Sequence, residues 1–93
     1  MSIIEVDEIV SLINHLLIKA SETGNYVSSG YPTHINDIYN IALFVEAVAS
    51  ELNAIVEHIN DEHILMKRNN LYTKITWSIG FHGDIEMTIE VYF

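Results

Sequence analysis

The chain has 93 residues, with 13 Asp and Glu against four Lys and Arg, and its formal net charge is −9 at pH 7. Such a field repels phosphate backbones, so we expect no direct binding of nucleic acid. The same field attracts basic protein surfaces. The alternative is that a net charge of this size only keeps the chain soluble. The absence of cysteine excludes disulfides, thiolate metal sites and cysteine nucleophiles, and it favours a reducing compartment. An apolar content of 49% suits one compact domain over residues 1–93.

The first residues are acidic rather than basic, and no apolar run approaches the roughly 20 residues of a membrane span. We therefore expect no signal peptide, no transmembrane helix and no membrane partner.

The N-terminal segment has apolar residues at three- and four-residue steps from Val6 to Ala20, which predicts a helix over residues 3–22. Ser2 and Glu5 have the spacing of a capping box, and Asp7 is an alternative N-cap. Gly24 provides the stop.

Residues 23–33 read TGNYVSSGYPT, and their glycine, serine, asparagine and proline favour turns. The segment predicts a loop of eleven residues. Long loops are often functional, so Tyr26 and Tyr31 are candidate contact residues. The alternative is that both tyrosines fold back over the core.

Helical periodicity from Ile38 to Ile59 predicts a long second helix over residues 36–60, with Asn36 or Asp37 as N-cap. Further apolar residues broaden its stripe and call for a second apolar partner, which is either the first helix as an antiparallel neighbour or another chain. These residues are Tyr39, Leu43, Phe44 and Ala47.

The C-terminal third switches to period two, which is typical of half-buried strands. Residues 71–81 and 85–93 each place apolar side chains on one face. A three-residue connection, His82-Gly83-Asp84, sets Phe81 opposite Ile85 and Trp77 opposite Ile89.

Upstream, Ile64 and Met66 alternate with Leu65 and Lys67, which predicts a third strand. It pairs with this hairpin across a two-residue turn at Asn69-Asn70, where both residues can take positive φ. This turn opposes Met66 to Thr73 and Ile64 to Ile75. The predicted fold is α+β: two N-terminal helices packed on one face of a three-stranded antiparallel β-meander, an ααβββ two-layer sandwich.

Candidate catalytic and metal-binding residues are scattered. His58 and Glu62 would share a face if the second helix continued, but their spacing matches no metalloprotease pattern. Ser28-Ser29-Gly30 lacks the strand-to-helix setting of a nucleophile elbow. We expect no enzyme, no cofactor and no metal. The other histidines are His15, His34 and His82.

The solvated face of the predicted sheet carries Glu86 and Glu90 with Tyr72 and Tyr92, an acidic and aromatic mixture that suits docking onto a lysine- or arginine-rich protein patch. Lys74 is expected diagonally across from Glu90 and would neutralise part of it. The alternative is an ordinary solvated sheet face.

The leading hypothesis is a non-enzymatic acidic binding module, an inhibitor or adaptor that occupies a basic surface of a target protein, such as a nucleic-acid-binding surface. The profile is similar to that of phage-encoded inhibitors such as anti-CRISPR proteins and of toxin-neutralising immunity proteins, a likeness of class that involves no particular residues. It implies the cytoplasm of a bacterial or phage-infected cell. The alternatives are a structural or regulatory homodimer that pairs through the long second helix, and a small histidine and carboxylate enzyme or metal-binding protein.

Overall fold

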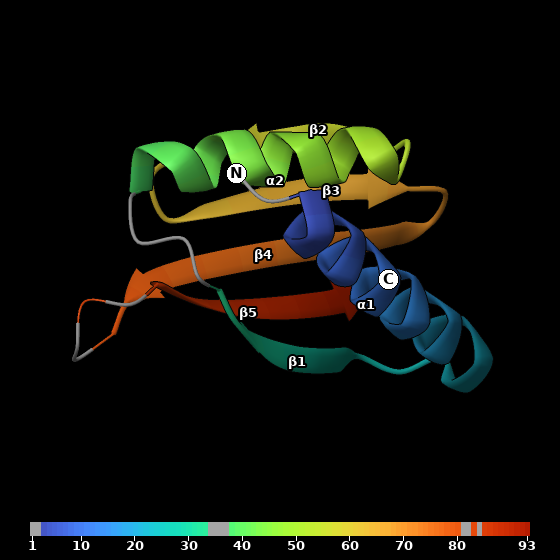
Figure 1. Cartoon of the computed structure of the whole chain (residues 1–93). Coiled ribbons are helices and arrows are strands. Elements are labelled where there is room, and N and C mark those ends of the chain that lie inside the picture. The colour runs from blue at the N-terminus through green and yellow to red at the C-terminus, as the bar shows by residue number, and fades with distance from the viewer. Residues whose placement is uncertain (1–2, 34–37, 81–82, 84) are drawn as a thin grey trace.

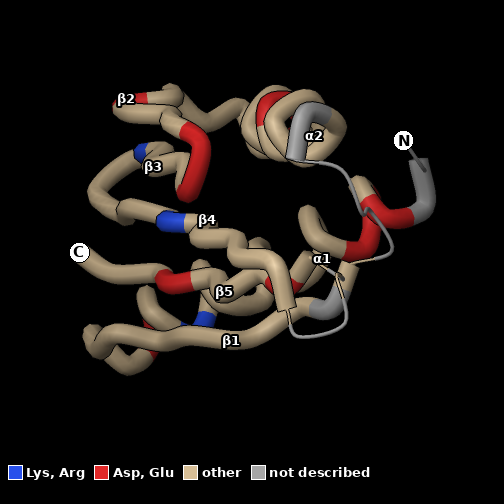
Figure 2. Tube along the Cα trace, turned by 90° about the vertical axis from the view of Figure 1, so that its left-hand side faces the viewer, with Lys and Arg blue, Asp and Glu red and all other residues tan. Residues whose placement is uncertain are grey.

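The computed structural model describes residues 3–33, 38–80, 83 and 85–93 (Figure 1). Its elements are α1 (Ile3–Thr23), β1 (Val27–Pro32), α2 (Ile38–Glu51), β2 (Ile55–Ile59), β3 (His63–Arg68), β4 (Leu71–Ile79) and β5 (Ile85–Tyr92). The five strands form one antiparallel sheet in the order β1-β5-β4-β3-β2. Both helices lie on one side of this sheet, and no described helix covers the other side (Figure 2).

The fold is α+β with an antiparallel sheet, but the predicted three-stranded meander is wrong because the sheet has five strands. The two additional strands, β1 and β2, form the two edges of the sheet. They come from the segment predicted as a loop and from the second half of the predicted long helix.

Helix α1 matches the prediction from periodicity. It ends where Gly24 takes a positive φ of 70° and its N–H donates to the carbonyl of Ala20 at 2.8 Å. This is the left-handed stop that glycine accepts without a steric penalty. The predicted capping residue Ser2 lies outside the described residues, and the side chain of Glu5 is buried instead of exposed at the helix start.

Strand β1 replaces most of the predicted loop. It pairs with β5 from Val27 opposite Val91 to Pro32 opposite Glu86. Two hydrogen bonds also attach this region to α1: Tyr31 donates its hydroxyl to Glu8 at 2.8 Å, and Thr33 donates to the buried Glu5 at 3.0 Å. Pairing to an open sheet edge and anchoring to a helix therefore override the turn preferences of serine and glycine.

Helix α2 is shorter than predicted and ends at a Schellman motif. The N–H of Asn53 donates to the carbonyl of Ser50 at 3.1 Å, and the N–H of Ala54 donates to that of Ala49 at 3.0 Å. Asn53 takes a positive φ of 53°, which asparagine tolerates better than most residues. The predicted helical continuation to residue 60 is wrong, since the chain reverses here and enters β2. The predicted N-caps Asn36 and Asp37 lie outside the described residues.

The hairpin of β3 and β4 confirms the predicted register, with Met66 opposite Thr73 and Ile64 opposite Ile75. Its two-residue turn differs from the predicted turn at one residue: Asn69 has a positive φ of 57°, whereas Asn70 does not.

The hairpin of β4 and β5 has a different register from the predicted one. Trp77 pairs with Met87 and Ile79 with Ile85, so the predicted pair of Trp77 with Ile89 is wrong, and Phe81, the predicted partner of Ile85, lies outside the described residues. The connection runs over residues 80–84, and the N–H of Gly83, at a φ of 84°, donates to the carbonyl of Gly80. The offset is two residues, so every side chain keeps its predicted face.

The core lies between the helices and the inward face of the sheet, and Phe44 of α2 is among its fully buried residues. The broad apolar stripe of α2 is therefore covered mainly within this chain, although Leu43 stays exposed. The remaining core side chains are Val6, Ile9, Ile13, Leu16, Leu17, Ala20, Ile41, Val45, Val48, Ala49, Leu52, Ile64, Met66, Leu71, Ile75, Trp77, Ile85, Met87, Ile89 and Val91.

Trp77 combines apolar burial with a specific hydrogen bond. Its side chain is 4% exposed, and its indole N–H donates to the carbonyl of Asp61 at 2.8 Å. We expect Trp77→Ala to lower the free energy of unfolding by roughly 3–5 kcal/mol in chemical denaturation. The control is Ser78→Ala on the exposed neighbour, which should change it by less than about 0.5 kcal/mol. A loss below about 1 kcal/mol for Trp77→Ala would contradict this packing.

Candidate functional site

The side of the sheet opposite the helices, here called the bare face, is mapped by the strand register, because directly opposed residues in a ladder point to the same side. Tyr92, Tyr72, Lys67 and Ile55 form one row across four strands. The bare face consists of Ser28 and Gly30 on β1, Ile55 and His58 on β2, His63, Leu65 and Lys67 on β3, Tyr72, Lys74, Thr76 and Ser78 on β4, and Glu86, Thr88, Glu90 and Tyr92 on β5.

One end of the bare face carries a tyrosine cluster, formed by Tyr26, Tyr72, Tyr92, Glu90 and Lys67. The rings of Tyr72 and Tyr92 stack with centroids 5.7 Å apart and an interplanar angle of 19°. The ammonium of Lys67 lies 5.4 Å from the centroid of the Tyr72 ring, and the hydroxyl of Tyr26 donates to Glu90 at 3.0 Å. The structure thus brings together four of the six residues predicted to bind a partner.

Glu86 lies on the bare face and is exposed. Tyr31 does not join it. Tyr31 is opposite the buried Met87 and therefore points to the helix side of the sheet, where its hydroxyl binds Glu8 of α1. Among the predicted contact residues, Tyr31 thus has a structural role in attaching β1 to α1.

The environment of Tyr31 has an electrostatic consequence. Burial, the hydrogen bond to Glu8 and the negative charges of Glu8 and Glu5 raise the pKa of Tyr31 from 10.0 to about 12. All these effects favour the neutral phenol.

The charge on the bare face is mixed. The predicted diagonal position of Lys74 relative to Glu90 is wrong, because Lys74 lies directly opposite Glu90. Lys67 lies on the same face, opposite Tyr72. These lysines are matched by Glu86 and Glu90, so this face does not itself hold the acidic excess. Nearby acidic residues lie instead around β2: Glu57, Asp61 and Glu62 are all exposed.

Strand β2 is an apolar edge. Ile55 is 68% exposed, Val56 41% and Ile59 37%, and no strand in the described part of the chain pairs with the outer side of β2. The register shifts between Val56 and His58, which marks a bulge that contains Glu57. A bulge with a charged residue discourages uncontrolled pairing of an edge with other strands.

His58 and Glu62 do not share a helix face, because α2 ends before them. The rings of His58 and His63 lie 5.2 Å apart on neighbouring strands, and Asn60 forms the turn between them by accepting from the N–H groups of Glu62 and His63. Within the described ranges, no group of three or more His, Cys, Asp or Glu residues is placed to hold a metal ion. His34 and His82 lie outside those ranges.

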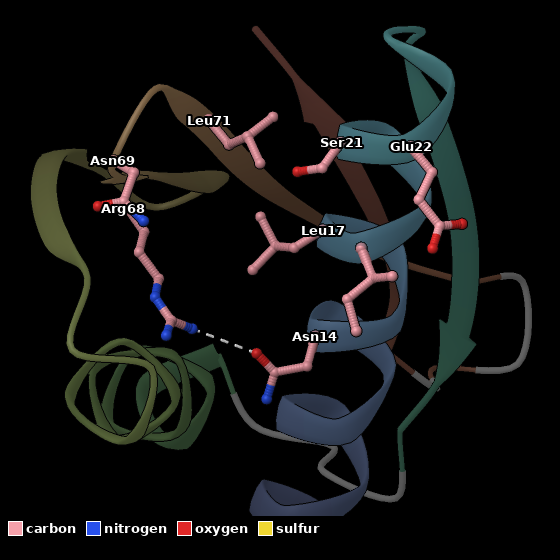
Figure 3. Close-up of a pocket in the computed structure, with 8 residues that line it drawn as sticks. Asn14, Leu17, Ser21, Glu22, Arg68, Asn69 and Leu71 are labelled. Atoms are coloured by element: carbon pink, nitrogen blue, oxygen red, sulfur yellow. Dashed lines mark hydrogen bonds between the residues drawn. The ribbon is translucent and has the colours of Figure 1, made fainter.

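A pocket of about 420 Å³ lies between the C-terminal half of α1 and the hairpin of β3 and β4 (Figure 3). The guanidinium of Arg68 donates to the side-chain oxygen of Asn14 at 3.3 Å across it. Sequence reasoning missed this site because its walls are more than 40 residues apart in the chain. The lining residues are Asn14, Leu17, Ile18, Ser21, Glu22, Arg68, Asn69 and Leu71.

Comparison of the chain with protein-family models, curated proteins and solved structures found no match. Neither described helix has the length and apolarity needed to cross a membrane. The candidate sites are therefore assigned from their geometry and chemistry alone.

The raised pKa of Tyr31 predicts a pH dependence of stability. Because the folded pKa exceeds the unfolded value of 10.0, the protonated phenol stabilises the folded state below pH 10, and this contribution is lost as the pH rises through about 12. We expect Tyr31→Phe to remove that component from the pH profile of the urea midpoint. Tyr26→Phe is the matched control and should retain it. An unchanged profile in Tyr31→Phe would contradict the assignment.

Proposed function

We propose that this protein is a non-enzymatic binding module that docks its bare face on a basic surface of another protein, as an inhibitor or adaptor. The tyrosine cluster is the observation that supports this proposal most directly. Its stacked rings are held on adjacent paired strands, so little conformational entropy is lost when a partner binds them.

The chemistry of the cluster suits arginine in particular. Tyr72 and Tyr92 are half-buried, and each combines an apolar ring with a polar hydroxyl, a combination that is enriched at protein interfaces. A guanidinium can stack on such a ring and bind a carboxylate at the same time. Glu90 supplies this carboxylate next to the rings, two residues before Tyr92 on β5, and Glu86 supplies a second one further along the same face.

The charge around the bare face supports a protein partner over a nucleic acid. The net charge of −9 repels phosphates, and the carboxylates of Glu57, Asp61 and Glu62 extend the negative field along the β2 side. A basic protein surface is attracted by the same field.

The two alternatives have less support. The homodimer hypothesis relied on a long second helix with an uncovered apolar stripe, whereas α2 spans 14 residues and buries Phe44, Val45 and Val48 in the core. A histidine and carboxylate enzyme or metal-binding protein needs such residues close together, and His58 and Glu62 do not share a helix face because α2 ends at Glu51.

Association with a basic partner should be steered by charge. We expect the association rate constant to fall severalfold between low and physiological salt, while the dissociation rate constant changes less. Surface plasmon resonance on a partner isolated by affinity capture and identified by mass spectrometry measures both. An association rate that does not depend on salt would point to the apolar β2 edge as the contact.

The carboxylates of the bare face should affect binding without affecting folding. We expect the double variant Glu86→Gln, Glu90→Gln to lose about 1–3 kcal/mol of binding free energy, with a nearly unchanged thermal midpoint. Glutamine keeps the size of each side chain and can still accept the hydrogen bond from Tyr26.

The matched control is Glu46→Gln, Glu51→Gln, which removes the same charge from exposed positions on α2. It should slow association slightly and leave dissociation unchanged. Equal losses in both double variants would show that only net charge matters, and an unchanged affinity in the first would remove the bare face from the proposal.

A further inference from the structure

The pocket between α1 and the hairpin of β3 and β4 combines an apolar floor with polar walls. Leu17 and Leu71 form buried apolar parts of the lining, and Ile18 stays 59% exposed beside them. Arg68, Asn14 and Ser21 supply polar groups around this floor (Figure 3). Small-molecule sites have this composition, with an apolar surface and a few polar groups that orient the ligand.

Arg68 is the only arginine of the chain, and it remains available to a ligand. A guanidinium has five N–H donors in a planar fork, and the bond to Asn14 engages one nitrogen. Although the chain has 13 acidic residues, none within the described ranges forms an ion pair with Arg68. The remaining donors match the geometry of a carboxylate that binds with both oxygens.

The backbone positions Arg68 at this place. It is the last residue of β3, pairs with Leu71 of β4, and is followed by Asn69 in its left-handed conformation. Asn14 lies one helical turn before Leu17 and Ile18 on α1, so the bond from Arg68 to Asn14 holds the guanidinium next to the apolar floor.

The electrostatic surroundings restrict the charge of a ligand. Glu22 also lines the pocket, and the whole chain is strongly negative. A dianion such as a phosphate monoester would gain from one guanidinium and be repelled by the rest. A single carboxylate on an apolar body gains from both Arg68 and the leucines.

We propose that this pocket binds a small monocarboxylate with an alkyl or aromatic body, whose carboxylate lies on Arg68 and whose body covers Leu17 and Leu71. The volume of about 420 Å³ is in the range of small-molecule pockets and accommodates a chain of about six to eight carbons. The pocket shares no residue with the tyrosine cluster, so this inference stands independently of the proposed docking function.

The test is a titration of the ¹⁵N-labelled full chain, followed by amide chemical shifts, with hexanoate, hexanol and hexylammonium. We expect saturable shifts at Ser21, Arg68, Asn69 and Leu71 with hexanoate in the millimolar range. Hexanol should bind about tenfold more weakly, and hexylammonium should not saturate, because both lack the carboxylate that Arg68 binds.

Two variants separate a role of Arg68 in binding from a role in folding. Arg68→Gln should weaken hexanoate about tenfold and leave hexanol unchanged. Asn14→Asp keeps Arg68 but places a carboxylate next to its guanidinium, and the resulting ion pair should abolish hexanoate binding while the amide spectrum stays folded. The charge-matched control is Lys74→Gln on the bare face, which should bind hexanoate as the parent does.

Three results would overturn the proposal: shifts that rise linearly without saturation, equal affinities for hexanoate and hexanol, or the same loss in Lys74→Gln as in Arg68→Gln.

Discussion

The antiparallel pairing of β4 with β5 is the constraint on which the rest of the structure depends. Its inward residues, among them Ile75, Trp77 and Ile89, belong to the same hydrophobic core as the buried side chains of both helices. Its outward residues form the centre of the bare face, and its two outer sides provide the edges to which β1 and β3 add. Since successive side chains in a strand alternate between faces, the same pairing fixes the core and the candidate binding surface together.

The two edges of the sheet differ in a way that follows from their sequences. Strand β1 contains Gly30 and ends at Pro32, and α1 anchors this region through Tyr31 and Thr33. Strand β2 instead presents the β-branched residues Ile55, Val56 and Ile59 and is interrupted by a charged bulge. Proline has no N–H to donate to a further strand, and the hydrogen bonds to α1 hold this region in place, so both features discourage pairing of the β1 edge with another chain. Of the three β2 residues, Ile55 lies on the bare face, whereas Val56 and Ile59 pair with the buried Met66 and Ile64 and therefore lie on the helix side of the sheet.

Sequence reasoning recovered what local chemistry determines. Helix α1, its stop at Gly24 and the faces of β4 and β5 follow from periodicity and turn residues, and this places Glu86, Glu90, Tyr72 and Tyr92 on one face.

Strand β1 was missed because its stability comes from β5 and α1, which no local pattern records. Strand β2 was missed because the apolar spacing of residues 55–59 also fits a helix, and the decisive feature is the left-handed Asn53. A register shift of two residues leaves the pattern unchanged, so alternation alone could not predict the pairing of β4 with β5. The contact of Tyr26 with Glu90 and the whole Arg68 pocket join residues distant in sequence, and no local signal predicts either.

The placement of the few cations bears on specificity. Lys67, Arg68 and Lys74 all belong to the hairpin of β3 and β4, whereas Lys19 is alone on α1. The net field of the molecule attracts basic surfaces in general, but Lys67 and Lys74 on the bare face repel a uniformly basic one. A partner that docks here therefore needs arginines or lysines opposite Glu86 and Glu90 together with neutral or acidic groups opposite the two lysines. Under the proposed function, the attraction would bring many basic proteins to the surface, and the two lysines would restrict which of them bind.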